Sequence, residues 1–327
     1  MKKMMIFIGI MLVFTLISCS EVPINNTTLV TTTTTTSNTV SNTSTSQVVF
    51  DYLNEVTPTD ESKLFGPSGY LSNSEWHWHG TPVFSPDGKE MYWSKYIKAS
   101  NEIETWFTKE SNGTWSEPEK FTIDGIHGAY NCPVFADKGN ELYFLNFDGM
   151  TFTIYKVTRD GDTWINPEAI NIIIPEGKVL GWSFSVADNK NIYILLWDLN
   201  GLEHQKIYRA IYNNGEYSNP EPVDILDIGS DGVGGPSIAP DESYIIFDSV
   251  RSDGLGLHDI YVSFKNSMGQ FTSPINLGDQ VNTSVEDAGA TISPDGLYMF
   301  YTTQKTNDLG YNPYWIKIDE LEAFKTR

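Results

Sequence analysis

A short segment built around Ser-Pro-Asp-Gly, or a variant of it, recurs five times along the chain. The copies begin at Pro82, Pro133, Ser183, Pro236 and Ala290, so their spacing is nearly even. A regular period of about fifty residues is typical of repeat architectures, in which each copy is one supersecondary unit. The repeat therefore predicts that residues 50–327 form one domain of five similar units.

Each unit has the sequence pattern of antiparallel β-strands. Pro-Asp-Gly favours a tight turn, because Pro presets φ and Gly accepts a positive φ. The turn separates a short apolar run from an alternating one, such as Met91-Tyr92-Trp93, and a third strand follows. Four units then carry a fourth strand, which contains Pro118, Pro167, Pro220 or Pro274. Four antiparallel strands in about fifty residues are typical of one propeller blade.

The fifth unit ends without its fourth strand, and residues 64–71 (LFGPSGYL) are predicted to supply it. Pro67 stands as far before the first repeat, at Pro82, as Pro118 stands before the second, at Pro133. In this alignment Tyr70 takes the position of Phe121. We therefore predict an all-β, five-bladed β-propeller in which the N-terminal strand completes the last blade and removes an open sheet edge.

Residues 1–18 have the pattern of a signal peptide. Lys2 and Lys3 precede an apolar run over residues 6–17, which is too short to span a bilayer but suits a signal-peptide core. The run ends in Leu-Ile-Ser-Cys, which resembles the lipobox of bacterial lipoproteins, where the Cys becomes the acylated N-terminus. Cys19 is accordingly predicted to carry a lipid (palmitate) anchor. The alternative is an ordinary secretory signal with a chance Cys.

Residues 19–49 are predicted to form a disordered tether. More than half of the positions in 20–48 are Ser or Thr, and Glu21 is the single charged residue there. Such a segment buries too little apolar surface to offset the entropy of ordering it. A tethered lipoprotein of this kind is expected in the cell envelope, with the outer membrane or cell surface preferred.

The composition narrows the range of partners and chemistries. The formal net charge is −21, and it becomes −23 when the signal peptide and its two lysines are removed. Such a surface repels nucleic acid and anionic lipid, so membrane contact is expected through the anchor alone. Cys132 is the remaining Cys, and no catalytic elbow, zinc-binding or phosphate-binding motif is present. We expect a monomer without cofactor or metal.

The segment from Phe247 onward carries a family resemblance. It is similar to the TolB-type, WD-like propeller repeats of bacterial envelope proteins, and the likeness rests on Asp259-Ile260-Tyr261, Pro274–Gly278, Asn282-Thr283, Glu286-Asp287 and Ser293–Gly296. It covers nearly the whole predicted domain. The resemblance implies a propeller fold, and it implies envelope scaffolding and protein binding more often than catalysis.

The innermost strand of each propeller blade begins at one face, where the preceding loops surround the central channel. The candidate binding residues at this mouth are His77, His79, His127, Tyr130, Asn131, Trp182, Glu286 and Asp287, together with Arg251 from a loop on the same face. They suit a ligand site. Alternatively, they are polar loop residues that bond to nearby backbone, and Arg251 pairs with neighbouring acids.

Two functions remain open from the sequence. The first is a lipid-anchored module that binds or scaffolds an envelope protein or polysaccharide, without catalysis. The alternative is a glycan-active enzyme, a glycosidase or lyase. Glycoside hydrolysis needs two carboxyl groups within about 10 Å of each other, and the candidates at the mouth are Glu75, Asp231, Glu286 and Asp287.

Overall fold

The computed structural model describes residues 50–66, 76–97, 100, 102–199, 201–228, 232–305 and 310–325, with the backbone alone for 76–79 and 201–204. The predicted signal peptide, the tether and Cys19 lie outside these residues. Residues 49–327 form one compact unit. In the described part of this unit, no helix is long and apolar enough to cross a bilayer.

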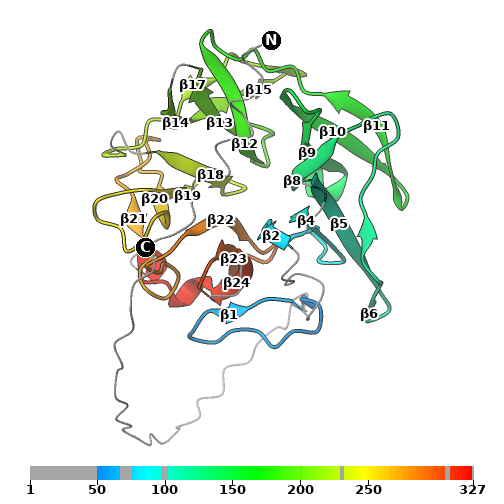
Figure 1. Ribbon diagram of the computed structural model, residues 1–327, viewed down its shortest axis with the longest axis horizontal. Helices are drawn as coiled ribbons and strands as arrows, with labels where there is room; N and C mark the ends of the chain where they lie inside the picture. The colour runs from blue at the N-terminus through cyan, green and yellow to red at the C-terminus, as the bar shows by residue number, and fades with distance from the viewer. Residues whose placement is uncertain are drawn as a thin grey trace, which may run out of the picture. The chain divides into compact units, whose positions relative to one another are not determined.

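Five antiparallel sheets follow one another along the chain, one for each repeat, and they are arranged as the blades of a β-propeller (Figure 1). Blade 1 contains β2 (Trp76–His79), β3 (Val83–Phe84), β4 (Glu90–Ile97), β5 (Glu102–Ser111), β6 (Thr114–Trp115) and β7 (Glu119–Lys120). Blade 2 contains β8 (Ala129–Ala136), β9 (Glu141–Phe147), β10 (Phe152–Asp160) and β11 (Thr163–Ala169).

The remaining blades repeat this order. Blade 3 contains β12 (Lys178–Val186), β13 (Ile192–Asp198), β14 (Gly201–Ala210) and β17 (Glu221–Pro222), with the small hairpin β15 (Tyr212–Asn213) and β16 (Glu216–Tyr217). Blade 4 contains β18 (Val233–Ile238), β19 (Tyr244–Ser249), β20 (Asp259–Phe264) and β21 (Ile275–Asn276). Blade 5 contains β22 (Asp287–Ile292), β23 (Tyr298–Thr303), β24 (Asn312–Lys317) and β1 (Lys63–Leu64). The short helix α1 (Glu322–Lys325) follows.

The Ser-Pro-Asp-Gly segments form the predicted turns. In blade 1, the Ser85 hydroxyl donates to the Asp87 carboxylate at 2.6 Å and accepts the backbone N–H of Glu90 at 2.9 Å. Gly88 has a φ of +72°, and a Cβ there would lie 2.1 Å from the ring of Phe50, so this position requires Gly. The same turn recurs in blade 5, where Ser293 makes the equivalent bonds.

The N-terminal strand completes the last blade, as predicted. β1 pairs antiparallel with β24, with Lys63 opposite Trp315 and Leu64 opposite Tyr314. The pairing continues beyond β1, because the N–H of Phe65 donates to the carbonyl of Pro313 at 2.9 Å. The two ends of the domain are therefore hydrogen-bonded side by side.

The register of this strand differs from the predicted alignment. Lys63 pairs with Trp315, just as Lys120 pairs with Trp106, the corresponding residue of blade 1. The next residue, Leu64, therefore takes the position of Phe121, which the prediction gave to Tyr70. Residues 67–71 lie outside the described residues. The physical reason lies in the next residue, Phe65, whose fully buried ring anchors the strand against blade 5.

The core consists of five apolar clusters, each between two neighbouring blades. Alternation along the strands produces this arrangement, because successive side chains point to opposite faces of a sheet. In β9, Leu142 and Phe144 pack toward blade 1, whereas Tyr143 and Leu145 pack toward blade 3. Every middle strand thereby contributes to two clusters, and the blades depend on one another for burial.

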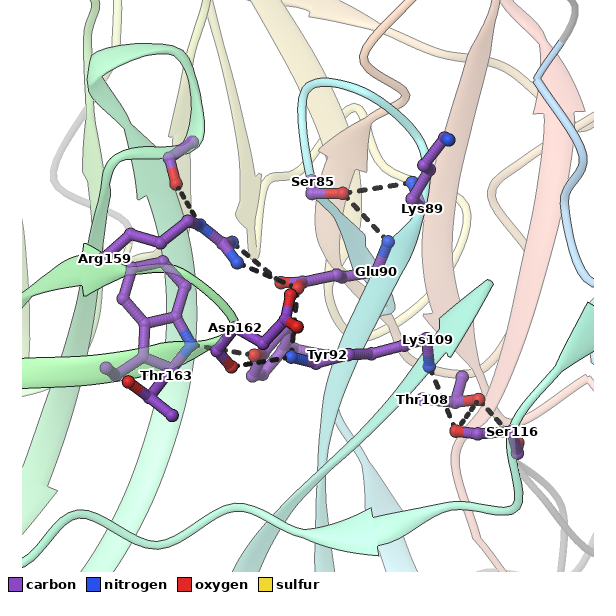
Figure 2. A network of polar contacts seen from close by, with 12 residues as sticks. Ser85, Lys89, Glu90, Tyr92, Thr108, Lys109, Ser116, Arg159, Asp162 and Thr163 are labelled. Carbon is purple, nitrogen blue, oxygen red and sulfur yellow. Dashed lines mark hydrogen bonds and ion pairs between the residues drawn. The ribbon is translucent and has the colours of Figure 1, made fainter. Parts of the chain in front are cut away.

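A polar network joins blades 1 and 2 at the end of the blades where the Ser-Pro-Asp-Gly turns lie (Figure 2). The Glu90 carboxylate accepts two hydrogen bonds from the Arg159 guanidinium, at 2.9 and 2.8 Å. Lys109 Nζ lies 3.3 Å from Glu90 Oε1 and donates to the carbonyl of Asp162 at 3.0 Å. Glu90 is buried, so removal of its partner would leave a desolvated charge, which typically costs about 3–5 kcal/mol.

The closure generates a prediction about stability. We expect deletion of residues 50–72 to cause aggregation, because it removes the edge strand of blade 5 and exposes the backbone and apolar face of β24. Phe65→Ala, a milder change, should lower the free energy of unfolding by about 3–5 kcal/mol. Size-exclusion chromatography detects the aggregation, and urea unfolding followed by Trp fluorescence measures the loss of stability.

Deletion of residues 20–48 is the matched control and should leave the unfolding midpoint unchanged. A soluble monomer with the wild-type midpoint after deletion of 50–72 would contradict the proposed role of the closing strand.

Candidate functional site at the channel mouth

The strand directions define a mouth face of the propeller. The innermost strands β8, β12, β18 and β22 begin at this face, and the loops that join the second and third strands of each blade return to it. In blades 2, 3 and 4 the described residues of these returning loops are 148–151, 199 and 250–258. The Ser-Pro-Asp-Gly turns lie at the opposite face.

A β-bulge interrupts the innermost strand in each of blades 2 to 5. The register shifts lie between Asn131 and Val134, Leu180 and Phe184, Gly234 and Ser237, and Ala288 and Thr291. A bulge re-aims the side chains around it, and bulges are common beside functional sites. The apolar pattern of the sequence does not reveal these bulges, because a bulge changes the pairing between strands and not the apolar pattern of either strand.

Trp182 lies in the bulge of blade 3 and is 44% exposed. Its ring packs edge-on against the buried ring of Trp197, with the centroids 4.3 Å apart. The neighbouring Gly181 allows this approach, since a Cβ there would lie 2.9 Å from Trp197 Nε1. The structure thus holds an exposed aromatic ring in a fixed orientation on an innermost strand.

The candidates of blade 2 have different environments. His127 is exposed. Tyr130 is buried, and its hydroxyl donates to the carbonyl of Ile126 at 2.6 Å, which is a structural contact. Asn131 is buried, and its Oδ1 has no hydrogen-bond partner among the described residues. Of the three, His127 presents a polar group that a ligand can engage, whereas the Asn131 oxygen is itself buried.

Arg251 is held by its own neighbourhood. Its Nε lies 3.0 Å from the Asp253 carboxylate, and its Nη1 donates to the carbonyls of Asp227 and Ile228, each at 3.1 Å. These contacts join the loop of blade 4 to the connection from blade 3. The arrangement matches the alternative in which Arg251 pairs with nearby acids.

Glu286 and Asp287 are neighbours with separate roles. The Asp287 carboxylate accepts from the backbone N–H of Thr283 at 2.6 Å and from its hydroxyl at 2.9 Å, which holds the turn before β22. Glu286 Oε1 lies 3.1 Å from His258 Nδ1. Burial raises the pKa of Glu286, but hydrogen bonds from His258 and Tyr311 lower it by more.

Asp248 joins this cluster, and the sequence analysis did not single it out. It is a buried residue of β19, and its Oδ1 accepts the backbone N–H of Gly289 at 3.3 Å. Burial raises its pKa, although the charge of His258 opposes the shift. A Cβ at Gly234 or Gly235 would lie 2.2 or 2.3 Å from its oxygens. The glycines on the innermost strand of blade 4 therefore make room for this carboxyl group.

The remaining candidates are not placed. Glu75 and Asp231 lie outside the described residues, and the side chains of His77 and His79 do as well. Within the described ranges, no group of three or more His, Cys, Asp or Glu side chains is arranged to hold a metal ion. Of the four carboxylates proposed for glycan chemistry, the structure therefore describes the side chains of Glu286 and Asp287 only.

No family model matches the chain, and no curated protein matches its sequence. Several solved structures resemble its fold. TolB from Acinetobacter baumannii is 16% identical with a TM-score of 0.45, and the match covers 75% of this chain and 55% of that one. The chain therefore spans about half the length of that TolB.

Two enzymes are similar to the same degree. An endo-arabinase from Bacteroides thetaiotaomicron VPI-5482 is 14% identical with a TM-score of 0.48, over 78% of this chain and 97% of that one. A gluconolactonase from Xanthomonas campestris is 12% identical with a TM-score of 0.45, over 80% and 96%. Likenesses at this level concern the fold and do not choose between binding and catalysis.

The acid–histidine cluster generates a prediction about pH. Burial lowers the pKa of His258, but the hydrogen bond to Glu286 and the charge of Asp248 raise it by more, so the net shift is upward. The folded state therefore holds this proton more tightly than the unfolded state does. The resulting stabilisation is complete below about pH 6.5, and it is lost as the pH rises through the raised pKa.

We expect the wild-type free energy of unfolding to fall above about pH 6.5 and His258→Gln to lack this decline. Glu286→Gln should weaken it, because the partner that raises the pKa is removed. Urea titrations at a series of pH values measure the slopes. Equal slopes for the wild type and His258→Gln in this range would contradict the assignment.

Proposed function

We propose that this protein is a lipid-anchored propeller of the cell envelope that binds a protein or a glycan at its mouth face. The observation that carries the proposal is Trp182, an exposed ring held rigidly on an innermost strand by Trp197. Trp is enriched among the residues that dominate binding energy, and a preoriented ring loses little entropy on binding. The exposed His127 adds a polar group on blade 2.

A glycan-active enzyme is the second candidate function, and the Asp248–Glu286 cluster favours it. The environment raises the pKa of Asp248 and lowers that of Glu286. Two carboxyl groups whose pKa values are pushed apart are the pattern of a general acid and its ionised partner. Asp248 takes the place of the predicted Asp287, whose Oδ2 is occupied by Thr283.

One experiment separates the two candidates. The full-length protein is incubated with envelope proteins and polysaccharides, and both retention and release of reducing ends are measured. We expect retention without hydrolysis, and we expect Trp182→Ala to weaken it about tenfold, as loss of a central aromatic anchor does. Met268→Ala, at a more exposed apolar position on the opposite face, is the control and should bind normally.

Hydrolysis that is lost in Asp248→Asn would instead establish the enzyme. Retention that survives Trp182→Ala unchanged for every ligand would contradict a binding site at this ring.

Anchoring through Cys19 is tested separately. We expect Cys19→Ser to release the protein from membranes, because Cys19 is the attachment site that the lipobox-like sequence predicts. Membrane fractionation after a high-salt wash, with labelled palmitate, measures anchoring and acylation together. A Cys19→Ser protein that stays in the washed membrane fraction would contradict the lipobox interpretation.

A further inference from the structure

We propose that the mouth-face loops of blades 2 to 4 form a docking surface for a protein segment that combines apolar anchors with basic side chains. The inference deepens the proposed function, on which it rests, because it commits that function to a protein partner. The surface, here called the loop patch, comprises Met150, Ile173, Leu199, Leu255 and Leu257.

The side chains of the loop patch are exposed to solvent. The five side chains of the loop patch are between 50% and 73% exposed. Each lies on a loop of the mouth face, and the loops follow one another from blade 2 to blade 4. Elsewhere among the described residues, comparable exposure is found for Met268 and Ile211 at the opposite face and for Val56 and Leu64 in the N-terminal segment. Concentration of apolar side chains on one face marks an interaction surface, whereas scattered ones need no explanation.

Backbone contacts make the loop patch a preformed surface. The N–H of Leu199 donates to the carbonyl of Gly177 at 2.9 Å, which joins blade 3 to the connection from blade 2. Arg251 joins blade 4 to the connection from blade 3 through the carbonyls of Asp227 and Ile228. The N–H of Leu257 donates to the carbonyl of Val285 at 2.9 Å. A surface ordered before binding loses less entropy when a partner docks.

Charge identifies the partner's chemistry. The same loops carry exposed acids at Asp148, Glu176 and Asp224. Their basic side chains are already paired with acids, since Lys178 lies 2.6 Å from Asp198, Arg251 lies 3.0 Å from Asp253, and His258 lies 3.1 Å from Glu286. The loop patch is thus apolar with an acidic rim, which complements a basic segment.

The same charge disfavours two other occupants. A second copy of the chain would bring identical acidic rims together on a protein of net charge −21, and an anionic membrane would be repelled. A basic protein segment with apolar anchors remains the occupant that fits both the exposed side chains and the rim.

Short synthetic peptides test the inference on the full-length protein by fluorescence anisotropy at physiological salt. The probes are equal in length and alternate Leu with Lys, Leu with Glu, or Ser with Lys. We expect the Leu/Lys peptide to bind, the Ser/Lys peptide to bind about tenfold more weakly, and the Leu/Glu peptide not to bind. A tenfold change corresponds to about 1.4 kcal/mol.

Variants separate apolar docking from general charge attraction. Leu199→Asp and Leu257→Asp each remove an apolar contact and add a negative charge. If the inference is right, they weaken binding of the Leu/Lys peptide about tenfold. If charge attraction alone acts, they strengthen it. Met268→Asp adds the same charge at the opposite face and should change affinity less than twofold. Met150→Asp is a second test of the patch, and all four positions are at least half exposed. Unchanged unfolding midpoints verify that the variants are folded.

Equal binding of the Ser/Lys and Leu/Lys peptides, or an equal loss in Met268→Asp, would overturn the inference. Leu199-dependent binding to phosphatidylcholine vesicles, without peptide binding, would overturn it in favour of a membrane. If the loop-patch variants bind normally while Trp182→Ala still loses its ligand, the docking inference fails and the proposed function stands.

Discussion

The aromatic seam between blades 5 and 1 is the interaction on which the rest of the structure depends. Phe65 lies 4.8 Å from Phe300 and 5.1 Å from Trp315 between ring centroids, and Tyr52 packs edge-on against Phe84 from blade 1. A propeller buries its sheets only against neighbouring blades, so an open seam would expose two blade faces at once. The closing strand is short and forms only two ladder pairs, which would hold it weakly on their own. The packing of the aromatic rings keeps it in place.

The closed ring then determines where function can lie. Innermost strands from separate repeats converge at one mouth, and their bulges place Trp182 and the glycines beside Asp248 there. The exposed positions of the loops are free to present apolar and acidic side chains at the same face. The proposed binding role uses this face, and the apolar, acidic character of the loops favours a basic protein segment as the ligand.

Several features followed from the sequence alone. The even period of the repeat, the Pro-Asp-Gly turns and the alternation in segments such as Met91-Tyr92-Trp93 were sufficient to predict five blades and an N-terminal closing strand. These signals are local, because each turn and each alternating run reflects the backbone preferences and burial of its own residues. The lipobox-like segment before Cys19 is likewise local, and anchoring there remains a prediction.

Only the tertiary structure determined the features that depend on pairing between strands and on close contact between residues of different repeats. The register of β1 was set by burial of Phe65 against rings from the other end of the domain, so the spacing of prolines predicted the strand but not its alignment. Asp248 and His258 became part of a site because glycines and loops of two blades meet around them. Sequence analysis predicted Glu286 at the mouth, but only contacts between blades could distinguish it from the structural Asp287 beside it.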